Sequence, residues 1–127
     1  MRTNLIISLL LLVLTIAAGL WEEQGTQNLS DRYVSAAMEI RIMLEKEDWP
    51  RASETARAYR EQWQRAVHWL QVLINHEDID DVTLALVRLQ AAIEASDLSS
   101  GYEACAELEE NARHIHHRDA FTLGNVL

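Results

Sequence analysis

The stretch LINHEDIDD, residues 73–81, combines side chains that could bind a divalent cation, because His76 stands beside four carboxylates. The zinc-protease motif H-E-x-x-H is not formed, since the residue four positions after His76 is Asp80 rather than a second histidine. A calcium loop of the EF-hand type is not formed either, because such a loop needs a central glycine and Ile79 interrupts the acids. We therefore interpret this stretch as the corner between two helices.

The corner interpretation follows from the electrostatics of helix ends. His76 would lie at the negative C-terminal end of one helix, where a cation is favoured, and the acids would lie at the positive N-terminal end of the next. Either Asp78 or Asp80 would then be the N-cap residue of the second helix. A weak divalent-ion site is the alternative for the same residues.

A second candidate site is HIHH, residues 114–117. On a helix, Glu110, His114 and His117 share one face, and this spacing can hold a zinc or copper ion, with Asp119 as a further carboxylate ligand. Histidines near a helix C-terminus are also favoured without any metal. The sequence therefore leaves two alternatives open, a metal-responsive binding or sensor domain and a helix end that binds no metal.

No arrangement of residues typical of an enzyme is found in the sequence. A nucleophile elbow, a phosphate-binding loop and a paired-carboxylate signature are all missing. The single Cys105 falls among the apolar positions of a helical pattern, which favours a small core residue over a reactive thiol. We therefore predict that the protein is not an enzyme, and the sequence indicates no catalytic residue, cofactor or small-molecule substrate.

The charge of the chain excludes one class of partner. Its net charge is −9, and ten basic and twenty acidic side chains follow Trp21. Such a surface repels the phosphate backbone of nucleic acids. We expect a protein partner, or a second copy of the chain, rather than DNA or RNA.

The N-terminus contains an apolar run, LIISLLLLVLTIAAGLW, residues 5–21. As a helix this run is about 25 Å long, near the lower limit for spanning a membrane. Arg2 precedes it and two glutamates follow it, so the positive-inside rule places the N-terminus in the cytoplasm and the remainder outside. We predict an uncleaved, single-pass transmembrane signal anchor over residues 1–21. Cleavage as a signal peptide after Gly19 is the alternative.

The remainder, residues 22–127, is expected to form one extracytoplasmic domain of amphipathic helices, because apolar residues recur three and four positions apart. GTQN, residues 25–28, is loop-like, although helix could continue through it. Ser100 and Glu103 resemble a capping box at the start of the last helix. The fold class predicted is all-α, with an N-terminal transmembrane signal-anchor helix followed by a three- to four-helix antiparallel bundle. The expected core positions are Leu29, Tyr33, Ala36, Ile40, Met43 and Leu44, then Trp49, Ala52, Ala56, Tyr59, Trp63, Ala66, Leu70 and Leu73, then Ile79, Val82, Leu86, Leu89 and Ile93, and finally Tyr102, Cys105, Leu108, Ala112 and Ile115.

Two polar or amphipathic residues do not fit this apolar pattern. Trp69 lies off the apolar seam of its helix, which leaves open a contact surface and a second layer of core. Arg88 lies among apolar neighbours, and we expect it to form an ion pair with one of the surrounding acids.

Several short stretches carry a resemblance to a known family. EKEDW, INHEDID and the L-x-R-L pattern around Arg88 resemble an uncharacterised bacterial family, domain of unknown function forty-three sixty-three. The resemblance extends over nearly the whole chain. It implies a bacterial, membrane-anchored, all-helical protein, and it transfers no catalytic residue.

Two functional hypotheses follow from the sequence. The leading one is a non-enzymatic interaction or scaffold module, tethered to the bacterial cell membrane with its bundle on the extracytoplasmic side. The alternative is the metal-responsive binding or sensor domain that would use His114, His117 and Glu110.

Overall fold

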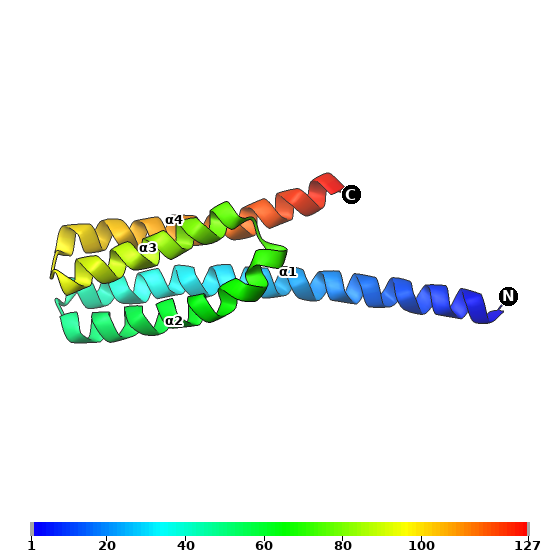
Figure 1. Cartoon of the computed structure of the whole chain (residues 1–127), viewed down its shortest axis with the longest axis horizontal. Helices are drawn as coiled ribbons and strands as arrows, with labels where there is room; N and C mark the ends of the chain where they lie inside the picture. Colours follow the sequence, from blue (N-terminus) through cyan, green and yellow to red (C-terminus); the bar gives the residue numbers. More distant parts are fainter. Residues whose placement is uncertain (1, 127) are drawn as a thin grey trace.

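The computed structural model describes the backbone of residues 2–126 and the side chains of residues 2–18 and 28–115. Over that backbone the chain forms four α-helices, which are α1 (Arg2–Glu45), α2 (Trp49–Leu73), α3 (His76–Glu94) and α4 (Leu98–Val126). Successive helices run antiparallel, and both α1 and α3 pack against α2 and α4 (Figure 1). The expected all-α antiparallel bundle is confirmed.

Helix α1 combines the apolar N-terminal run and the first helix of the bundle. It is one helix of 44 residues, and it continues through the loop-like residues 25–28. A single glycine costs a helix only about 1 kcal/mol relative to alanine, which the many helix-favouring neighbours offset. The boundary expected between residues 21 and 22 therefore falls inside a helix.

The first part of α1 extends beyond the bundle, away from the other helices (Figure 1). Ten large apolar side chains between Leu5 and Ile16 are 51–71 % exposed. The end of the apolar run, Gly19 to Trp21, lies outside the described side chains. Among the described residues, no helix has the length and apolar character that a membrane crossing requires.

The core of the bundle follows the apolar pattern of the sequence closely. All expected positions on α1 and α3 are buried, as are those on α4 except the half-buried Tyr102. On α2 the seam is buried at Ala52, Ala56, Trp63 and Leu70, and it is half-buried at Trp49, Tyr59 and Ala66, which pack against the core. The expectation was wrong for Leu73, which is 41 % exposed.

Trp63 joins three of the helices at one level of the bundle. Its indole is fully buried and meets the Tyr33 ring of α1 edge to face, with 5.0 Å between the ring centroids. The indole Nε1 donates a hydrogen bond of 2.8 Å to Thr83 Oγ1 of α3. At the neighbouring interface, the buried Ser30 hydroxyl of α1 donates to the Ala112 carbonyl of α4 at 2.7 Å. These contacts fix the register of the helices along the bundle axis.

The corners between α1 and α2 and between α3 and α4 have the same backbone geometry. Glu47 and Ser96 both have φ of 52°, in the left-handed region. The next residue in each corner is an aspartate whose N–H bonds to a carbonyl five residues earlier, which is the Schellman motif. Each aspartate, Asp48 and Asp97, then caps the following helix with its side chain. In each corner, the same aspartate therefore completes the C-terminal motif of one helix and caps the N-terminus of the next.

The cap of α4 differs from the sequence-based expectation. Ser100 was expected to be the N-cap, but α4 begins at Leu98 and Asp97 accepts the N–H of Ser100 at 3.1 Å. Ser100 lies in the first turn, where its hydroxyl donates to the second Asp97 oxygen at 2.7 Å. Asp and Ser have similar preferences for the N-cap position, so the sequence DLSS, residues 97–100, does not show which of the two residues is the cap.

The corner between α2 and α3 is confirmed, but its details differ from the prediction. Asn75 is the N-cap of α3, and its side-chain oxygen accepts the N–H of Glu77 at 3.4 Å. The prediction of Asp78 or Asp80 as the cap was therefore wrong. His76 is the first residue of α3, so its expected place at the C-terminal end of α2 was also wrong.

The assignment of Asn75 predicts a difference between two alanine substitutions. We expect Asn75→Ala to lower the free energy of unfolding by about 0.5 to 2 kcal/mol, because it removes the cap of α3. Asp80→Ala, an exposed position on the same helix, should change it by less than about 0.5 kcal/mol. Denaturant unfolding of both variants in detergent, followed by circular dichroism, measures the difference. A larger loss for Asp80→Ala would contradict the assignment.

Candidate functional site

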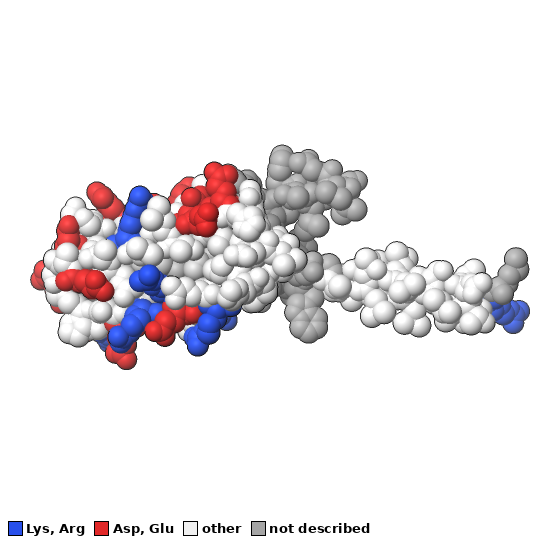
Figure 2. Space-filling view, viewed as in Figure 1, with Lys and Arg blue, Asp and Glu red and all other residues white. Residues whose placement is uncertain are grey.

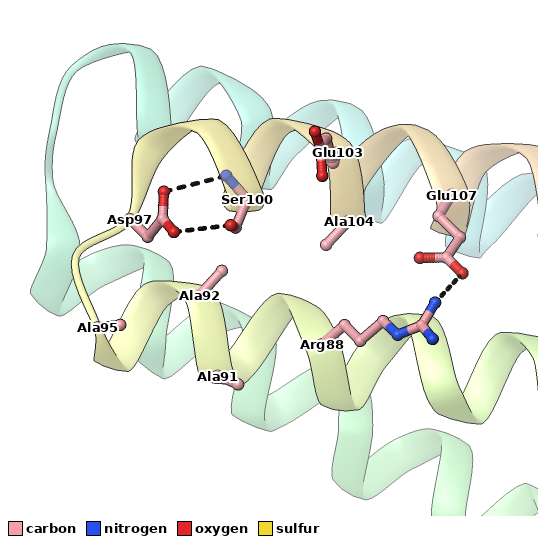
Figure 3. A pocket seen from close by; sticks show the side chains of 9 residues that line it. All are labelled: Arg88, Ala91, Ala92, Ala95, Asp97, Ser100, Glu103, Ala104 and Glu107. Carbon is pink, nitrogen blue, oxygen red and sulfur yellow. Dashed lines mark hydrogen bonds and ion pairs between the residues drawn. The ribbon is translucent and has the colours of Figure 1, made fainter.

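A groove of about 460 Å³ lies between α3 and α4, close to the corner that joins them (Figure 3). Four alanines line it, and Ala92 and Ala104 among them are buried. The alanine methyl groups fill only part of the space between α3 and α4 here, and the rest of that space is the groove. The lining is completed by Arg88, Ala91, Ala95, Asp97, Ser100, Glu103 and Glu107.

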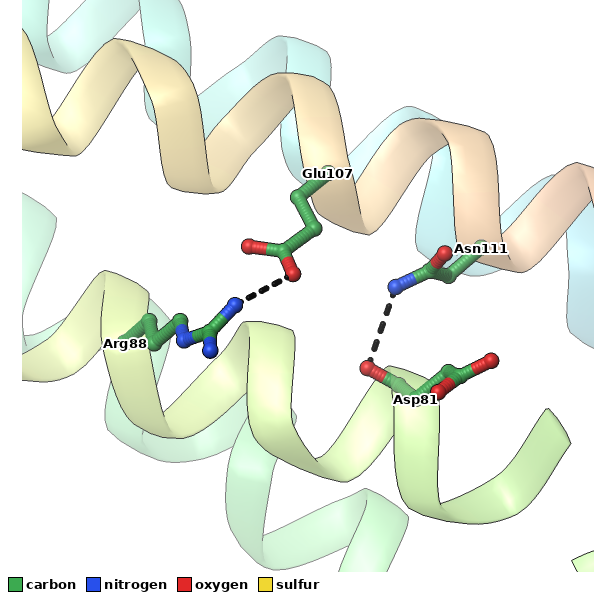
Figure 4. Close-up of polar contacts among 4 residues, drawn as sticks. All are labelled: Asp81, Arg88, Glu107 and Asn111. Atoms are coloured by element: carbon green, nitrogen blue, oxygen red, sulfur yellow. Dashed lines mark hydrogen bonds and ion pairs between the residues drawn. The ribbon is translucent and has the colours of Figure 1, made fainter. Parts of the chain in front are cut away.

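An ion pair bounds one end of the groove. Arg88 Nη1 of α3 lies 2.6 Å from Glu107 Oε1 of α4, which confirms the ion pair expected for Arg88 (Figures 3 and 4). Next to it, the Asn111 side chain donates to the Asp81 carbonyl at 3.1 Å (Figure 4). The ion pair is partly exposed, so solvent limits its contribution to stability to about 1 kcal/mol or less. The two contacts fix α4 against α3 beside the groove.

The cap of α4 bounds the other end of the groove. The hydroxyl of Ser100 and the backbone N–H groups that Asp97 accepts lower the pKa of the Asp97 carboxyl below its ordinary value. Asp97 therefore stays ionised at neutral pH. A serine nucleophile needs a base that can take its proton near neutral pH, and a carboxylate with a lowered pKa is a poor base. The contact between these two side chains is thus a structural cap.

The groove is suited to binding a cation. Its lining carries three carboxylates and one guanidinium, which leaves a net negative charge when all four groups are ionised. The nine lining residues include no histidine, lysine or cysteine. Glu107 is paired with Arg88 and Asp97 accepts hydrogen bonds at the cap, so Glu103 and the alanine methyl groups are the part of the lining suited to the charged end and the stem of a lysine or arginine side chain.

The proposed metal ligands are only partly within the described side chains. Glu110 and His114 lie on one face of α4, with 4.0 Å between Glu110 Oε1 and His114 Nε2, and both are more than half exposed. His117 and Asp119 lie outside the described side chains. Over the side chains that are described, no group of three or more His, Cys, Asp or Glu residues could hold a metal ion. The metal hypothesis remains a prediction.

Cys105 lies in the core of the bundle, as expected from the apolar pattern. It is 2 % exposed, and burial raises the pKa of its thiol to about 11. The thiolate is the reactive form of cysteine, so this thiol is poorly reactive at neutral pH.

The groove itself was not found by sequence reasoning. Ala91 of α3 and Ala95, which caps the C-terminus of α3, are four residues apart, and Ala91 follows Arg88 by three residues, but Arg88 was singled out only as an ion-pair partner. The signal for the groove in the sequence is the pair Ala91 and Ala95, which line it together with Ala104 of α4. It becomes visible only when the register between the two helices is known.

The chain belongs to a known family. The family model described as "Domain of unknown function (DUF4363)" matches residues 20–126, which is most of the chain. The family expected from the sequence is thereby confirmed. No curated protein and no solved structure matches the chain.

The geometry around His114 predicts the outcome of a metal titration. Among the described side chains Glu110 and His114 are the two candidate ligands, both exposed, and two ligands do not form a closed coordination shell, so we expect zinc or copper to leave the melting midpoint unchanged. A true site at a hundred times its dissociation constant would stabilise the fold by about 2.7 kcal/mol. Melting curves with a chelator and with added metal test this, with the His114→Ala, His117→Ala double variant as control. A metal-dependent rise that the double variant lacks would favour the metal-responsive alternative.

Proposed function

We propose that this member of the DUF4363 family is a membrane-tethered, non-enzymatic interaction module. In this proposal the apolar part of α1 lies in a lipid bilayer and the bundle stands in water. The observation that carries it is the exposure of ten large apolar side chains on the N-terminal extension of α1. Surface of this kind is unfavourable in water by about 25 cal/mol per Å², and a hydrocarbon environment removes that cost.

The distribution of charge supports the same placement. Charged side chains gather on the bundle, whereas the described part of the extension is uncharged apart from Arg2 at its end (Figure 2). The positive-inside rule then leaves Arg2 in the cytoplasm and places the bundle on the extracytoplasmic side of a bacterial cell membrane. Glu22 and Glu23 follow the apolar run on the outer side.

The groove between α3 and α4 is the proposed docking site for a partner protein. Its negative charge and its alanine floor suit a basic side chain that projects from a helix or loop of the partner. The groove lies at the end of the bundle that is remote from the extension of α1 (Figure 1), so a partner could reach it without entering the membrane. The partner is thus expected to present a lysine or arginine on the extracytoplasmic side.

Membrane tethering can be tested by placing charges in the apolar run. We expect the full chain to remain in the membrane fraction of bacterial cells after alkaline extraction. The double variant Leu10→Arg, Leu11→Arg should be released, because each arginine near the centre of a spanning helix costs about 2.5 to 3.5 kcal/mol. Met38→Arg, at an apolar bundle position that is 56 % exposed, is the matched control and should stay in the membrane fraction.

Two results would contradict the tethering proposal. One is release of the unaltered chain from membranes by alkaline extraction. The other concerns orientation, which protease added to protoplasts reports. A bundle that is cut only after the protoplasts are opened would lie in the cytoplasm, contrary to the orientation proposed.

Docking at the groove can be tested with a photoreactive amino acid. We expect a residue of this kind at Ala91 to yield a cross-linked product of defined mass in cells, whereas one at Ala58, an exposed alanine on α2, should not. Glu103→Lys should abolish the product, because it reverses a charge on the groove wall. A product that persists in Glu103→Lys, or one with twice the mass of the chain, would contradict docking of a basic partner.

A further inference from the structure

The last turns of α2 carry an exposed apolar cluster that does not belong to the core formed by the described residues. Trp69, Val72 and Leu73 are 53 %, 85 % and 41 % exposed, and their spacing of three and four residues places them on one side of the helix. We call these three residues the α2 tip. Between Ala66 and Asn75 the sequence contains no Asp, Glu, Lys or Arg. The tip is therefore apolar in a chain that is otherwise strongly acidic.

The α2 tip lies close to the place where α1 leaves the bundle (Figure 1). Trp63 of α2 packs against Tyr33 of α1, with 5.0 Å between the ring centroids, and the two helices run antiparallel. Nine residues along α2 lead from Trp63 to Val72, and nine residues back along α1 lead from Tyr33 to Gln24. The apolar run ends three residues before Gln24, at Trp21, so Val72 stands about 5 Å from the level at which that run ends.

Two exposed carboxylates of α3, Asp80 and Asp81, lie further from that level, whereas Glu22 and Glu23 of α1 follow Trp21 directly and lie close to it. Asn111 of α4 donates to the Asp81 carbonyl, and the adjacent Ala112 accepts from Ser30 of α1. Asp81 is therefore level with Ser30, nine residues or about 14 Å beyond Trp21. Asp80 is a single residue from Asp81. The headgroup layer of a bilayer is about 5 to 7 Å thick on each side, so these two acids stand outside it.

We propose that the α2 tip lies in the headgroup layer of the bilayer that holds α1. The inference rests on the proposed function, because it requires α1 to be embedded. Lipid is the occupant that the tip fits, since the tip is the neighbour of the apolar run, lacks charge and contains a tryptophan. Tryptophan rings are enriched at the membrane–water boundary, where an apolar body and a polar N–H are both accommodated. The bundle then rests on the membrane at two places, α1 and the α2 tip, which sets its tilt.

Spin labels on single introduced cysteines test this placement in the full chain. The chain is reconstituted into phosphatidylcholine vesicles, and collisions of the label with oxygen and with a water-soluble nickel complex are measured. Oxygen concentrates in lipid and the nickel complex in water. We expect a label at Val72→Cys to collide severalfold more with oxygen, relative to nickel, than a label at Ile42→Cys. Ile42 is the matched control, because it is an apolar α1 residue, 52 % exposed, on the bundle itself.

The native thiol does not interfere with this measurement. Cys105 is buried and its pKa is about 11, so it should take up little label, and the unaltered chain provides the background signal.

A third label, at Val13→Cys, separates the inference from the proposal on which it rests. In one outcome, the label at position 13 is in lipid, but the label at position 72 collides with nickel as often as the label at position 42. The α2 tip is then in water, so the inference is overturned while the tethering proposal stands. If label 72 is shielded from both oxygen and nickel, the tip is covered by protein and the inference is likewise overturned. If label 13 is itself in water, both tethering and the inference are overturned.

Discussion

The indole of Trp63 is the contact on which the arrangement of the bundle depends. It is completely buried, it packs against Tyr33 of α1, and its N–H is satisfied by Thr83 of α3. The Tyr33 hydroxyl donates to the Tyr59 carbonyl, and burial raises the pKa of Tyr33 to about 12. A large aromatic side chain with a hydrogen-bond requirement admits few alternative positions, so the heights of α1, α2 and α3 are fixed relative to one another. The levels of the α2 tip and of the groove follow from this register.

Small residues at the start of α4 serve two different interfaces. Gly101 faces α1, where an added Cβ would lie only 3.0 Å from Leu44 Cδ1, so the absence of a side chain permits close contact between α1 and α4. Ala104, one turn later, lines the groove toward α3. At the first position a neighbouring leucine fills the space that the small residue leaves. At the second position the space stays open, and the groove results.

The sequence predicted the core well because the spacing of apolar residues defines the buried face of a helix regardless of its partner. The sequence-based prediction was wrong where several candidate residues lie within one helical turn of each other. Asn75 caps α3 instead of the nearby aspartates, and Asp97 caps α4 instead of Ser100, because these residue types have nearly equal preferences for a cap. Leu73 continues the α2 seam in sequence, yet it is the last residue of α2 and is 41 % exposed. The groove could not be predicted, because alanine suits buried and exposed helical positions equally.

Because α1 is one continuous helix, it fixes the distance between the apolar run and each level of the bundle. Gly101, near the groove, is level with Leu44 of α1, and 23 residues of unbroken helix separate Leu44 from Trp21. At 1.5 Å per residue the groove stands about 35 Å from the end of the apolar run. With α1 in a bilayer, a partner whose basic side chain stays close to the lipid surface would not reach the groove, whereas one that projects it to this height would. In the proposed arrangement, the length of α1 would thus select partners by reach, in addition to the proposed selection by charge.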